Sequence, residues 1–516
     1  MANVALDAMI KRADFAQQTE DQTIELFDKL DISKVEMGAP ILEMLRKPDF
    51  QRETNHWKPD QVAELIYSFV HGQLIPSLIL WKSNSHVFVI DGAHRLSALK
   101  AWVHNDYGDG TLSHAFYNGE IPDVQKRSAK VTRRKVEDRV GRFTDLKSSI
   151  GNNDVHESFQ RLVTTTFTRT IPVQWIQGSQ EVAEVSFFKI NSQGTPLDKT
   201  EELLLRNRKK SFPIAARAIV RAGTGNRYWS KFDSEKQEQV EKLAGEIFAL
   251  LFQPELTSPI KTLDLPIGGT VSPVDALKMM LDVFSTLEGS ETSEKALKSM
   301  MDDPSGDETI RVLKLAQKLA KRISGNQPAS VGLHPAVYFY NERGRHSRFL
   351  FLGVVRFFAK AVVNGDTHFF KRFIGVRQKL ESHLIEKKVL INQALANVNS
   401  GQRIDRVHNL MSGLLKDLED NTEVNAERTL FHLGLKGKVA EIEYLEYPKS
   451  FSSDTKSAIF LEATLKKALE CPICGGKVDA SKSVSYDHII PKRFGGDGAK
   501  QNAQMTHPFC NTTVKN

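Results

Sequence analysis

The chain has 516 residues, which is too long for one ordinary hydrophobic core and predicts roughly two to four domains. Apolar residues make up 40% and charged residues 26%, proportions that exclude a disordered or fibrous protein. The net charge of +7 is a mild basic bias, which fits either a nucleic-acid partner or a solvated Lys/Arg surface.

No targeting or membrane segment is predicted. Residues 1–20 carry Asp7, Lys11, Arg12 and Asp14 and lack the apolar stretch of a signal peptide. No run of residues approaches the roughly 18 apolar residues of a membrane span. The three cysteines are too few for a disulfide framework, and their grouping near the C-terminus is typical of metal ligands in a reducing compartment. We therefore expect a cytoplasmic protein without a membrane partner.

The first part of the chain changes character near residue 40. Residues 1–40 are predicted as an amphipathic helical segment, whereas residues 41–210 alternate between strand-like and helix-like patterns, as in an α/β domain. Residues 126–142 hold eight Lys and Arg and two acids. This basic run predicts either a contact with DNA phosphates or a solvated helix face.

The clearest elements of the α/β region are a helix, two strands and a second helix, in that order. Pro59 suits the first position of the first helix, and Gly72 suits its end. Asp91-Gly92 directly follows the second strand and precedes the second helix. The expected bounds are residues 59–72, 78–81, 86–90 and 93–103.

The second half of the chain is predicted to be mostly helical until its last residues. Residues 211–446 follow a helical period with breaks at Gly- and Pro-rich stretches. Residues 447–470 are predicted as a linker that leads into a short helix at 458–470. Residues 471–516 hold all three cysteines and form the last predicted domain.

Two short ligand pairs frame the C-terminal domain. Cys471-Pro-Ile-Cys474 and His507-Pro-Phe-Cys510, separated by about thirty residues, have the spacing of one tetrahedral zinc site. Asp487-His488 lies between the pairs and Asn511 follows the second one. A structural zinc site does not need these three residues, so their presence indicates a further function.

These spaced features, with D-H-I-x-P and a Gly pair, resemble the HNH (ββα-metal) nuclease family over residues 471–516. The resemblance implies that the Asp-His pair ends the first strand of a hairpin and that the last Asn opens a helix across from it. It implies His488 as the general base, and Asp487 and Asn511 as oxygen ligands of one catalytic ion, Mg²⁺ or Mn²⁺. Asn502 is expected to bridge the hairpin and not to touch substrate.

One position departs from many relatives, which close the zinc site with a second C-x-x-C. His507 is therefore either a zinc ligand, with Cys471, Cys474 and Cys510, or a second catalytic histidine. Only five residues follow Asn511, so the final helix is expected to be short and to depend on the domain it packs on. Candidate phosphate contacts are Lys492, Arg493 and Lys515.

A second candidate site lies in the pentapeptide Asp91-Gly92-Ala93-His94-Arg95, between a predicted strand and a predicted helix. A glycine turn that opens a helix leaves backbone N–H groups directed at an anion, and His94 and Arg95 add side-chain donors. The pattern predicts a phosphate site, with an ordinary turn as the alternative.

Together with two further segments, this pentapeptide resembles the ParB-like domain of the GmrS type, which occurs in modification-dependent restriction and phage-defence proteins. The segments are Gln51-Arg52 with Trp57, and Phe187 to Asn191 with Gly194, so the likeness covers about residues 35–210. It implies nucleotide binding and, as an additional activity, NTP hydrolysis, although Ala93-His94 replaces two glutamines of the common form. The residues implied to bind the nucleotide are Gln51, Arg52, Asp91, Gly92, His94, Arg95 and Asn191.

The two resemblances imply a prokaryotic metal-dependent DNA endonuclease, a hydrolase of phage defence or modification-dependent restriction, regulated by its N-terminal domain. The expected fold is α+β multidomain: a ParB-like α/β domain, a helical middle and a zinc-stabilised ββα-metal module. The expected partners are DNA, including modified phage DNA, a nucleotide and a second copy of the chain, because one HNH site cuts one strand. Two alternatives remain: a DNA-binding NTPase or partition-like switch with a purely structural zinc module, and a nuclease toxin.

Overall fold

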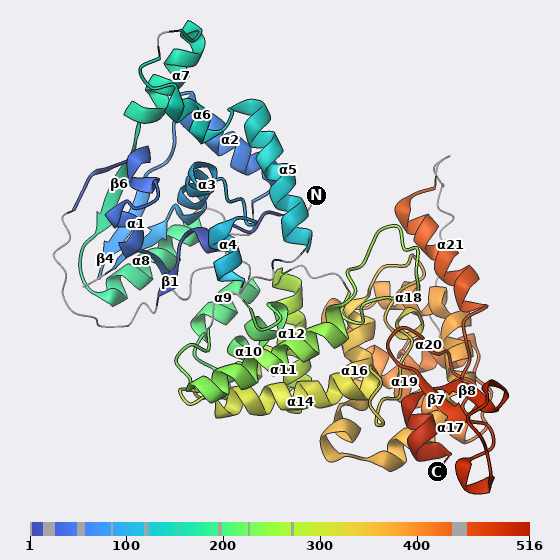
Figure 1. The fold of residues 1–516 in the computed structure, drawn as a ribbon. Coiled ribbons are helices and arrows are strands. Elements are labelled where there is room, and N and C mark those ends of the chain that lie inside the picture. The colour runs from blue at the N-terminus through green and yellow to red at the C-terminus, as the bar shows by residue number, and fades with distance from the viewer. Residues whose placement is uncertain are drawn as a thin grey trace. The chain divides into compact units, whose positions relative to one another are not determined.

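The computed structural model describes residues 3–13, 26–48, 57–83, 86–117, 121, 123–152, 154–193, 199–224, 228–269, 273–435 and 451–515. The chain divides into two compact units, Met1–Arg208 with Thr224–Tyr228, and Lys209–Gly223 with Trp229–Asn516 (Figure 1). Each unit is described by itself. Among the helices described, none is long and apolar enough to cross a membrane.

A six-stranded mixed sheet with the order β1-β3-β5-β4-β6-β2 lies at the centre of the first unit. Its strands β3 and β5 are parallel, β5 and β4 are antiparallel, and β4 and β6 are parallel. The strands are β1 (Arg12–Ala13), β2 (Lys29–Asp31), β3 (Leu45–Pro48), β4 (Leu78–Lys82), β5 (Val87–Asp91) and β6 (Thr170–Ile176).

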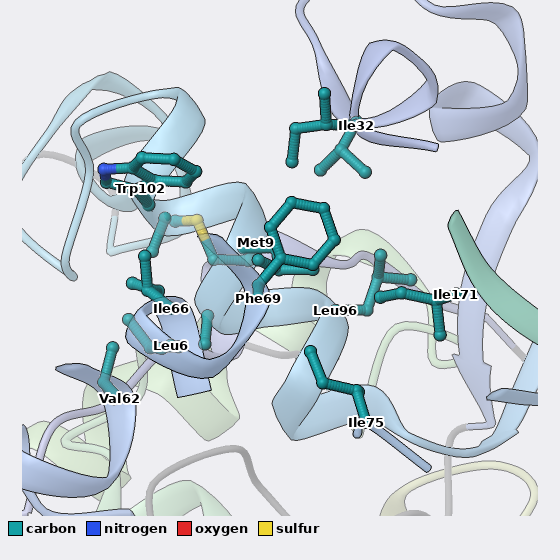
Figure 2. Packing of buried hydrophobic residues seen from close by; sticks show 14 of the residues in the cluster. Leu6, Met9, Ile32, Val62, Ile66, Phe69, Ile75, Leu96, Trp102 and Ile171 are labelled. Carbon is teal, nitrogen blue, oxygen red and sulfur yellow. The ribbon is translucent and has the colours of Figure 1, made fainter. Parts of the chain in front are cut away.

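Helices α2 and α3 supply much of the core of this unit. Val62, Ile66 and Phe69 recur three and four residues apart on α2, so they share one face and are buried together with Leu96 and Trp102 of α3 (Figure 2). The helices are α1 (Pro40–Met44), α2 (Pro59–Val70), α3 (Ala93–Val103), α4 (Thr111–Phe116), α5 (Asp123–Arg139), α6 (Phe143–Ser148), α7 (Glu157–Thr168), α8 (Gln180–Gln193) and α9 (Lys199–Arg206). The helix–strand–strand–helix order predicted for residues 59–103 is confirmed.

The helical segment predicted for residues 1–40 is wrong wherever the structure describes it. Two short 3-10 helices, Asp7–Met9 and Ile32–Val35, and strands β1 and β2 take its place. β1 pairs with β3, and β2 pairs with β6. These distant strands satisfy backbone hydrogen bonds of the segment, and its apolar residues enter the core from the two 3-10 helices as well as from extended chain.

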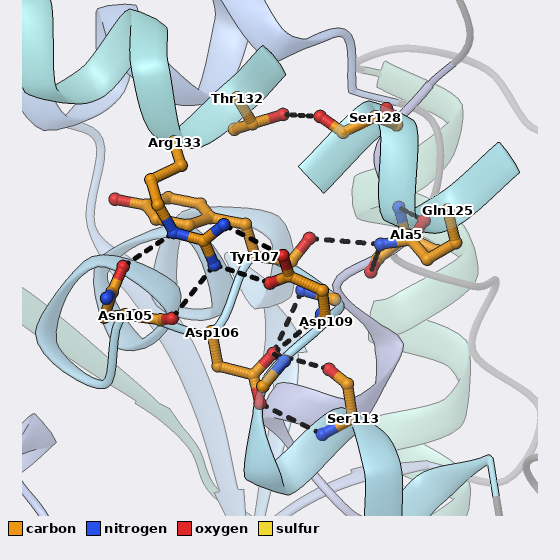
Figure 3. Close-up of polar contacts among 12 residues, drawn as sticks. Ala5, Asn105, Asp106, Tyr107, Asp109, Ser113, Gln125, Ser128, Thr132 and Arg133 are labelled. Atoms are coloured by element: carbon orange, nitrogen blue, oxygen red, sulfur yellow. Dashed lines mark hydrogen bonds and ion pairs between the residues drawn. The ribbon is translucent and has the colours of Figure 1, made fainter. Parts of the chain in front are cut away.

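Helix α5 carries the basic run, and three of its cations are used within the first unit. Arg133 pairs with Asp109 at 2.6 Å, and its guanidinium also lies 5.3 Å from the centre of the Tyr107 ring (Figure 3). Lys135 pairs with an acid of α2, and so does Arg139. These contacts favour a structural role for the three side chains over a contact with DNA.

The helical middle predicted for residues 211–446 is confirmed over the described part of that range, where α16 packs on α12 and α19, and α17 packs on α19. The last helix starts at Ser453, five residues before the predicted start. The helices of the second unit are α10 (Ser211–Val220), α11 (Ser234–Phe252), α12 (Pro273–Leu287), α13 (Ser293–Ser299), α14 (Asp307–Ile323), α15 (Pro335–Tyr338), α16 (Arg348–Asn364), α17 (Thr367–Glu386), α18 (Lys388–Ala396), α19 (Arg403–Glu419), α20 (Ala426–His432) and α21 (Ser453–Leu465).

The C-terminal module (residues 471–515) belongs to the second unit (Figure 1). Its hairpin consists of β7 (Ser485–His488) and β8 (Ala503–Thr506), paired antiparallel with Asp487 opposite Gln504. A single helical turn, Cys510–Val514, follows β8.

Candidate functional site

The four predicted zinc ligands converge in the C-terminal module. Their ligand atoms all lie within 4.8 Å of one another. Three of the residues are completely buried, and Cys474 is partly exposed. Thiolate sulfur and imidazole nitrogen are the atoms that zinc prefers, so the cluster could hold a zinc ion. The four residues are Cys471, Cys474, His507 and Cys510.

The hydrogen bonds of His507 define which of its nitrogens faces the cluster. Its Nε2 lies 3.0 Å from the carbonyl oxygen of Lys477, to which it must donate because a carbonyl only accepts. Its Nδ1 lies 3.4 Å from the sulfur of Cys474 and 3.9 Å from that of Cys510. Burial lowers the pKa of His507 and so keeps the imidazole neutral. This geometry favours the ligand role of His507 over a catalytic one.

The three thiols are too close together to be charged at once without a cation. Hydrogen bonds with Cys474 and Cys510 lower the pKa of Cys471, and the hydrogen bond with Cys471 raises the pKa of Cys474 to about 11. A divalent cation at this place would stabilise all three thiolates, which is the chemistry of a structural zinc site.

Helix α17 supplies a buried ion pair behind the zinc ligands. Arg377 and Glu381 are 0% and 2% exposed, and their side chains meet at 2.7 Å. Glu381 also accepts hydrogen bonds from the Lys477 N–H at 2.6 Å and the Tyr338 hydroxyl at 2.9 Å. Because the Lys477 carbonyl accepts from His507, one chain of hydrogen bonds runs from α17 to the metal cluster.

Two glycines permit this close approach. A Cβ atom on Gly476 would lie 2.5 Å from Nε of Arg377. A Cβ atom on Gly332, whose φ is +57°, would lie 2.9 Å from the Cβ of Ser483 and 3.0 Å from the ring of His507. Side chains at either position would push the module away from the helices.

Asp487 and His488 end strand β7, as the HNH resemblance implies. The Asp487 side chain is 8% exposed and accepts hydrogen bonds from Gln504 at 2.7 Å and Lys515 at 2.6 Å. Lys515 also donates to the backbone carbonyl of His488. Lys515, which was expected to contact phosphate, is therefore held next to Asp487 and His488.

Asn511 lies in the terminal helical turn, against the same strand. Its Nδ2 donates to the Ser485 hydroxyl at 2.8 Å and to the Tyr486 carbonyl at 3.2 Å. Ser485 and Asp487 are two residues apart on β7 and therefore point to one face of the hairpin. The carboxylate of Asp487 and the amide of Asn511 therefore lie on the same face of the hairpin, next to the last helical turn.

Asn502 bridges the hairpin loop, as predicted. Its Oδ1 accepts from the Ile490 N–H at 2.7 Å, and its Nδ2 donates to the carbonyls of Ile490 and Asp497.

The short final helix packs on the helical part of the unit. The Phe509 N–H donates to the Ser330 carbonyl at 2.9 Å, and the Thr512 hydroxyl donates to the Pro328 carbonyl at 2.8 Å.

The predicted nucleotide site is described only in part. Gly92, with φ +97°, lies between the end of β5 and the start of α3. A Cβ atom there would lie 2.4 Å from the Leu78 side chain. Arg95 turns back to Asp91 at 2.7 Å, and His94 stacks on Trp57 with ring centres 5.5 Å apart. Gln51 and Arg52 lie outside the described residues, and Asn191 is placed only as a residue of α8.

Sequence reasoning missed Gln504, Arg377 and Glu381. Gln504 could have been found from the register of the hairpin, because it stands opposite Asp487. Arg377 and Glu381 are four residues apart on a helix, a spacing typical of solvated surface pairs, so the sequence holds no sign of their burial.

Comparison with known families agrees with both ends of the chain. Residues 18–208 match the GmrSD restriction endonuclease, N-terminal domain, and residues 471–516 match the HNH endonuclease family. Searches of curated proteins and of solved structures give no match. The two matches support a nuclease that acts in restriction or defence. The chain therefore joins a GmrSD restriction endonuclease N-terminal domain to a C-terminal HNH endonuclease domain.

Proposed function

We propose that the protein is a metal-dependent DNA endonuclease of phage defence or modification-dependent restriction and cuts through its C-terminal HNH site. The observation that carries this proposal is that Asn511 is hydrogen-bonded to Ser485, whose side chain shares one face of the hairpin with that of Asp487, with His488 at the end of the same strand. A zinc ribbon without catalysis would need neither this carboxylate nor this amide.

Each residue has a defined part in the proposed reaction. His488 takes a proton from the water whose oxygen bonds to phosphorus. The bond from phosphorus to one bridging oxygen breaks, and that oxygen takes a proton from solvent to become a hydroxyl group. Asp487 and the amide oxygen of Asn511 would hold a Mg²⁺ or Mn²⁺ ion, which when bound supplies positive charge beside the phosphate. The Asn511 nitrogen donates to β7 and thereby fixes the orientation of the amide. Lys515 places a further cation beside the reacting phosphate.

Cleavage of plasmid and phage DNA tests the proposal. With Mg²⁺ or Mn²⁺ the chain should nick or cut DNA. A chelator, which removes the ion, or Asp487→Ala, which removes one of its ligands, should reduce the rate about 100-fold or more. Asp497→Ala is the matched control, because this exposed carboxylate lies in the same module outside the site. Equal cleavage by wild type and Asp487→Ala would contradict the proposal.

We further propose that a ParB-like nucleotide site in the first unit regulates cutting, in a chain that acts as a dimer. The glycine turn that opens α3, with Arg95 and His94 beside it, supports an anion site. NTP binding and hydrolysis should be measured together with cleavage of modified and unmodified DNA. If NTP changes neither the rate nor the choice of DNA, nucleotide regulation is wrong.

A further inference from the structure

Three large apolar side chains are exposed within six residues directly after His488. Ile489, Ile490 and Phe494 are 50%, 55% and 71% exposed. Scattered apolar residues on a surface need no explanation, but three of them in one short loop are typical of an interaction site. We name residues 489–494 the 489–494 loop.

Asn502 fixes the backbone at the start of this loop and at Asp497, three residues beyond its end. The Ile489 N–H donates to the Asn502 carbonyl at 2.8 Å, and the Ile490 N–H donates to its Oδ1 at 2.7 Å. The Asn502 Nδ2 donates to the Asp497 carbonyl at 2.8 Å. A loop that is already ordered presents its side chains without a further loss of backbone freedom on binding.

A tight turn forms the end of the loop and is capped by Gly495. Lys492–Phe494 form a 3-10 turn, and the Gly495 N–H donates to the Lys492 carbonyl at 3.0 Å. Gly495 has φ +84°, and a Cβ atom on Gly496 would lie 1.8 Å from the Ile490 carbonyl oxygen. The turn therefore holds the apolar side chains at the surface of the module.

Positive charge flanks the apolar side chains. Lys492 and Arg493 are exposed within the loop, and the Arg493 guanidinium lies 5.1 Å from the centre of the Phe494 ring. A groove of duplex DNA has a phosphate backbone along each edge, and the sugars and the stacked faces of the bases within it offer apolar surface beside the polar base edges. An apolar tip beside two cations matches that cross-section in shape and in charge.

We propose that the 489–494 loop enters a groove of duplex DNA beside the bond to be cut. Ile490 and Phe494 would contact base and sugar edges, and Lys492 and Arg493 the flanking phosphates. This inference rests on the proposed function, because His488 at the start of the loop must reach a phosphate of the same duplex. Apolar side chains that enter a groove unstack and bend the DNA, so cutting should favour easily deformed pyrimidine–purine steps.

Binding to a duplex that contains 2-aminopurine tests this proposal in the full-length chain. All variants carry His488→Ala so that the duplex stays intact. Phe494→Ala should weaken binding about tenfold or more, the effect of one buried aromatic side chain, and remove the fluorescence rise that reports unstacking. It should not change the dependence of affinity on salt. Lys492→Gln should instead lower the slope of log affinity against log salt by about 1.

Phe451→Ala is the matched control, because Phe451 is 69% exposed in the same unit but lies outside the module; it should leave affinity and fluorescence unchanged. Unchanged affinity and fluorescence in Phe494→Ala, with cleavage intact in the chain that retains His488, would overturn the loop proposal and leave the nuclease standing. A lower salt slope in Phe494→Ala would also overturn it, since the ring would then act only by placing Arg493. Absence of both binding and cleavage in the wild type would contradict the proposed function itself.

Discussion

The role of His507 depends on its second ring nitrogen. The Nε2–H group donates a hydrogen bond to the Lys477 carbonyl, which leaves the unprotonated Nδ1 directed at the sulfurs of Cys474 and Cys510. The spacing of the ligand pairs was enough to predict that these four residues cluster, because zinc sites are built from local knuckles. It could not separate ligand from catalyst at His507, because the position of a carbonyl thirty residues away in the sequence depends on the fold.

Replacement of His507 separates the two roles. His507→Ala should reduce the zinc content of the purified chain well below one ion per chain, because three ligands do not close a structural site. Metal analysis by mass spectrometry measures this content. A chain with full zinc but no cleavage would show instead that His507 is a catalytic histidine.

His346 links a buried imidazole to stability in acid. Burial lowers the pKa of His346 from 6.5 to about 4, although its hydrogen bond to the Ile267 carbonyl acts in the opposite direction. The unfolded chain therefore takes up a proton at a higher pH than the folded chain does. This contribution to stability is complete above pH 6.5 and is lost as the pH falls towards 4.

Melting temperatures at pH 7 and pH 5 test this linkage. His346→Gln should make the fall in melting temperature between these two pH values smaller than in the wild type. His368→Gln, at an exposed position of α17, is the control and should keep the wild-type fall. An equal fall in all three proteins would contradict the assignment.

At the scale of elements, local pattern predicted residues 59–103 because each of those helices and strands carries its own signals. Residues 1–40 were mispredicted because their strands are stabilised by distant partners, such as Ile171, which stands opposite Leu30 and lies 141 residues further along the chain. Periodicity cannot report such pairing. The same reason applies to α17, whose Arg377 and Glu381 are buried among partners distant in the sequence: the carbonyls of Val331 and Gly332 and the N–H of Lys477.

Arg377→Met should destabilise the second unit and loosen its metal cluster. Removing one partner of a buried ion pair leaves Glu381 charged and unpaired, which costs about 3–5 kcal/mol. The Lys477 peptide would then lose its fixed position, so zinc should pass to a chelator faster than from the wild type. A colorimetric chelator assay, run well below the melting temperature of each protein, measures the rate.

Arg372→Met is the matched control on the same helix. Arg372 pairs with Glu419 at the surface, and exposed pairs contribute little to stability. Its release of zinc should equal that of the wild type. Equal rates for both variants would mean that α17 does not position the zinc ligands.

At the scale of the molecule, the nuclease module belongs to the helical unit and the GmrSD-type domain forms the other unit. Sequence motifs located the two regions that match known families, because the residues of each motif are close together in the chain. They did not show that the module shares a buried network with α17, since this depends on packing between segments about 100 residues apart. The module therefore depends on the helices, whereas the first unit is a candidate regulator.

Truncation should reveal this division. A chain of residues 209–516 should fold and cut DNA without a nucleotide or a modified base, because it keeps the helices that support the module. Residues 471–516 alone should not fold stably. In this fragment the Phe509 N–H loses its acceptor on Ser330, and the Lys477 N–H loses its acceptor on Glu381. Circular dichroism and plasmid nicking measure both fragments. If residues 209–516 need the same signals as the full chain, regulation by the first unit is wrong.

The most direct test of the account compares wild type and His488→Ala in single-turnover cleavage of DNA with Mg²⁺ or Mn²⁺. Zinc content and melting temperature should be equal, because His488 lies outside the zinc cluster. Loss of the general base should slow cleavage by about 10²–10⁴-fold. Cleavage by His488→Ala at the wild-type rate would contradict the assignment of the C-terminal site as an HNH nuclease centre.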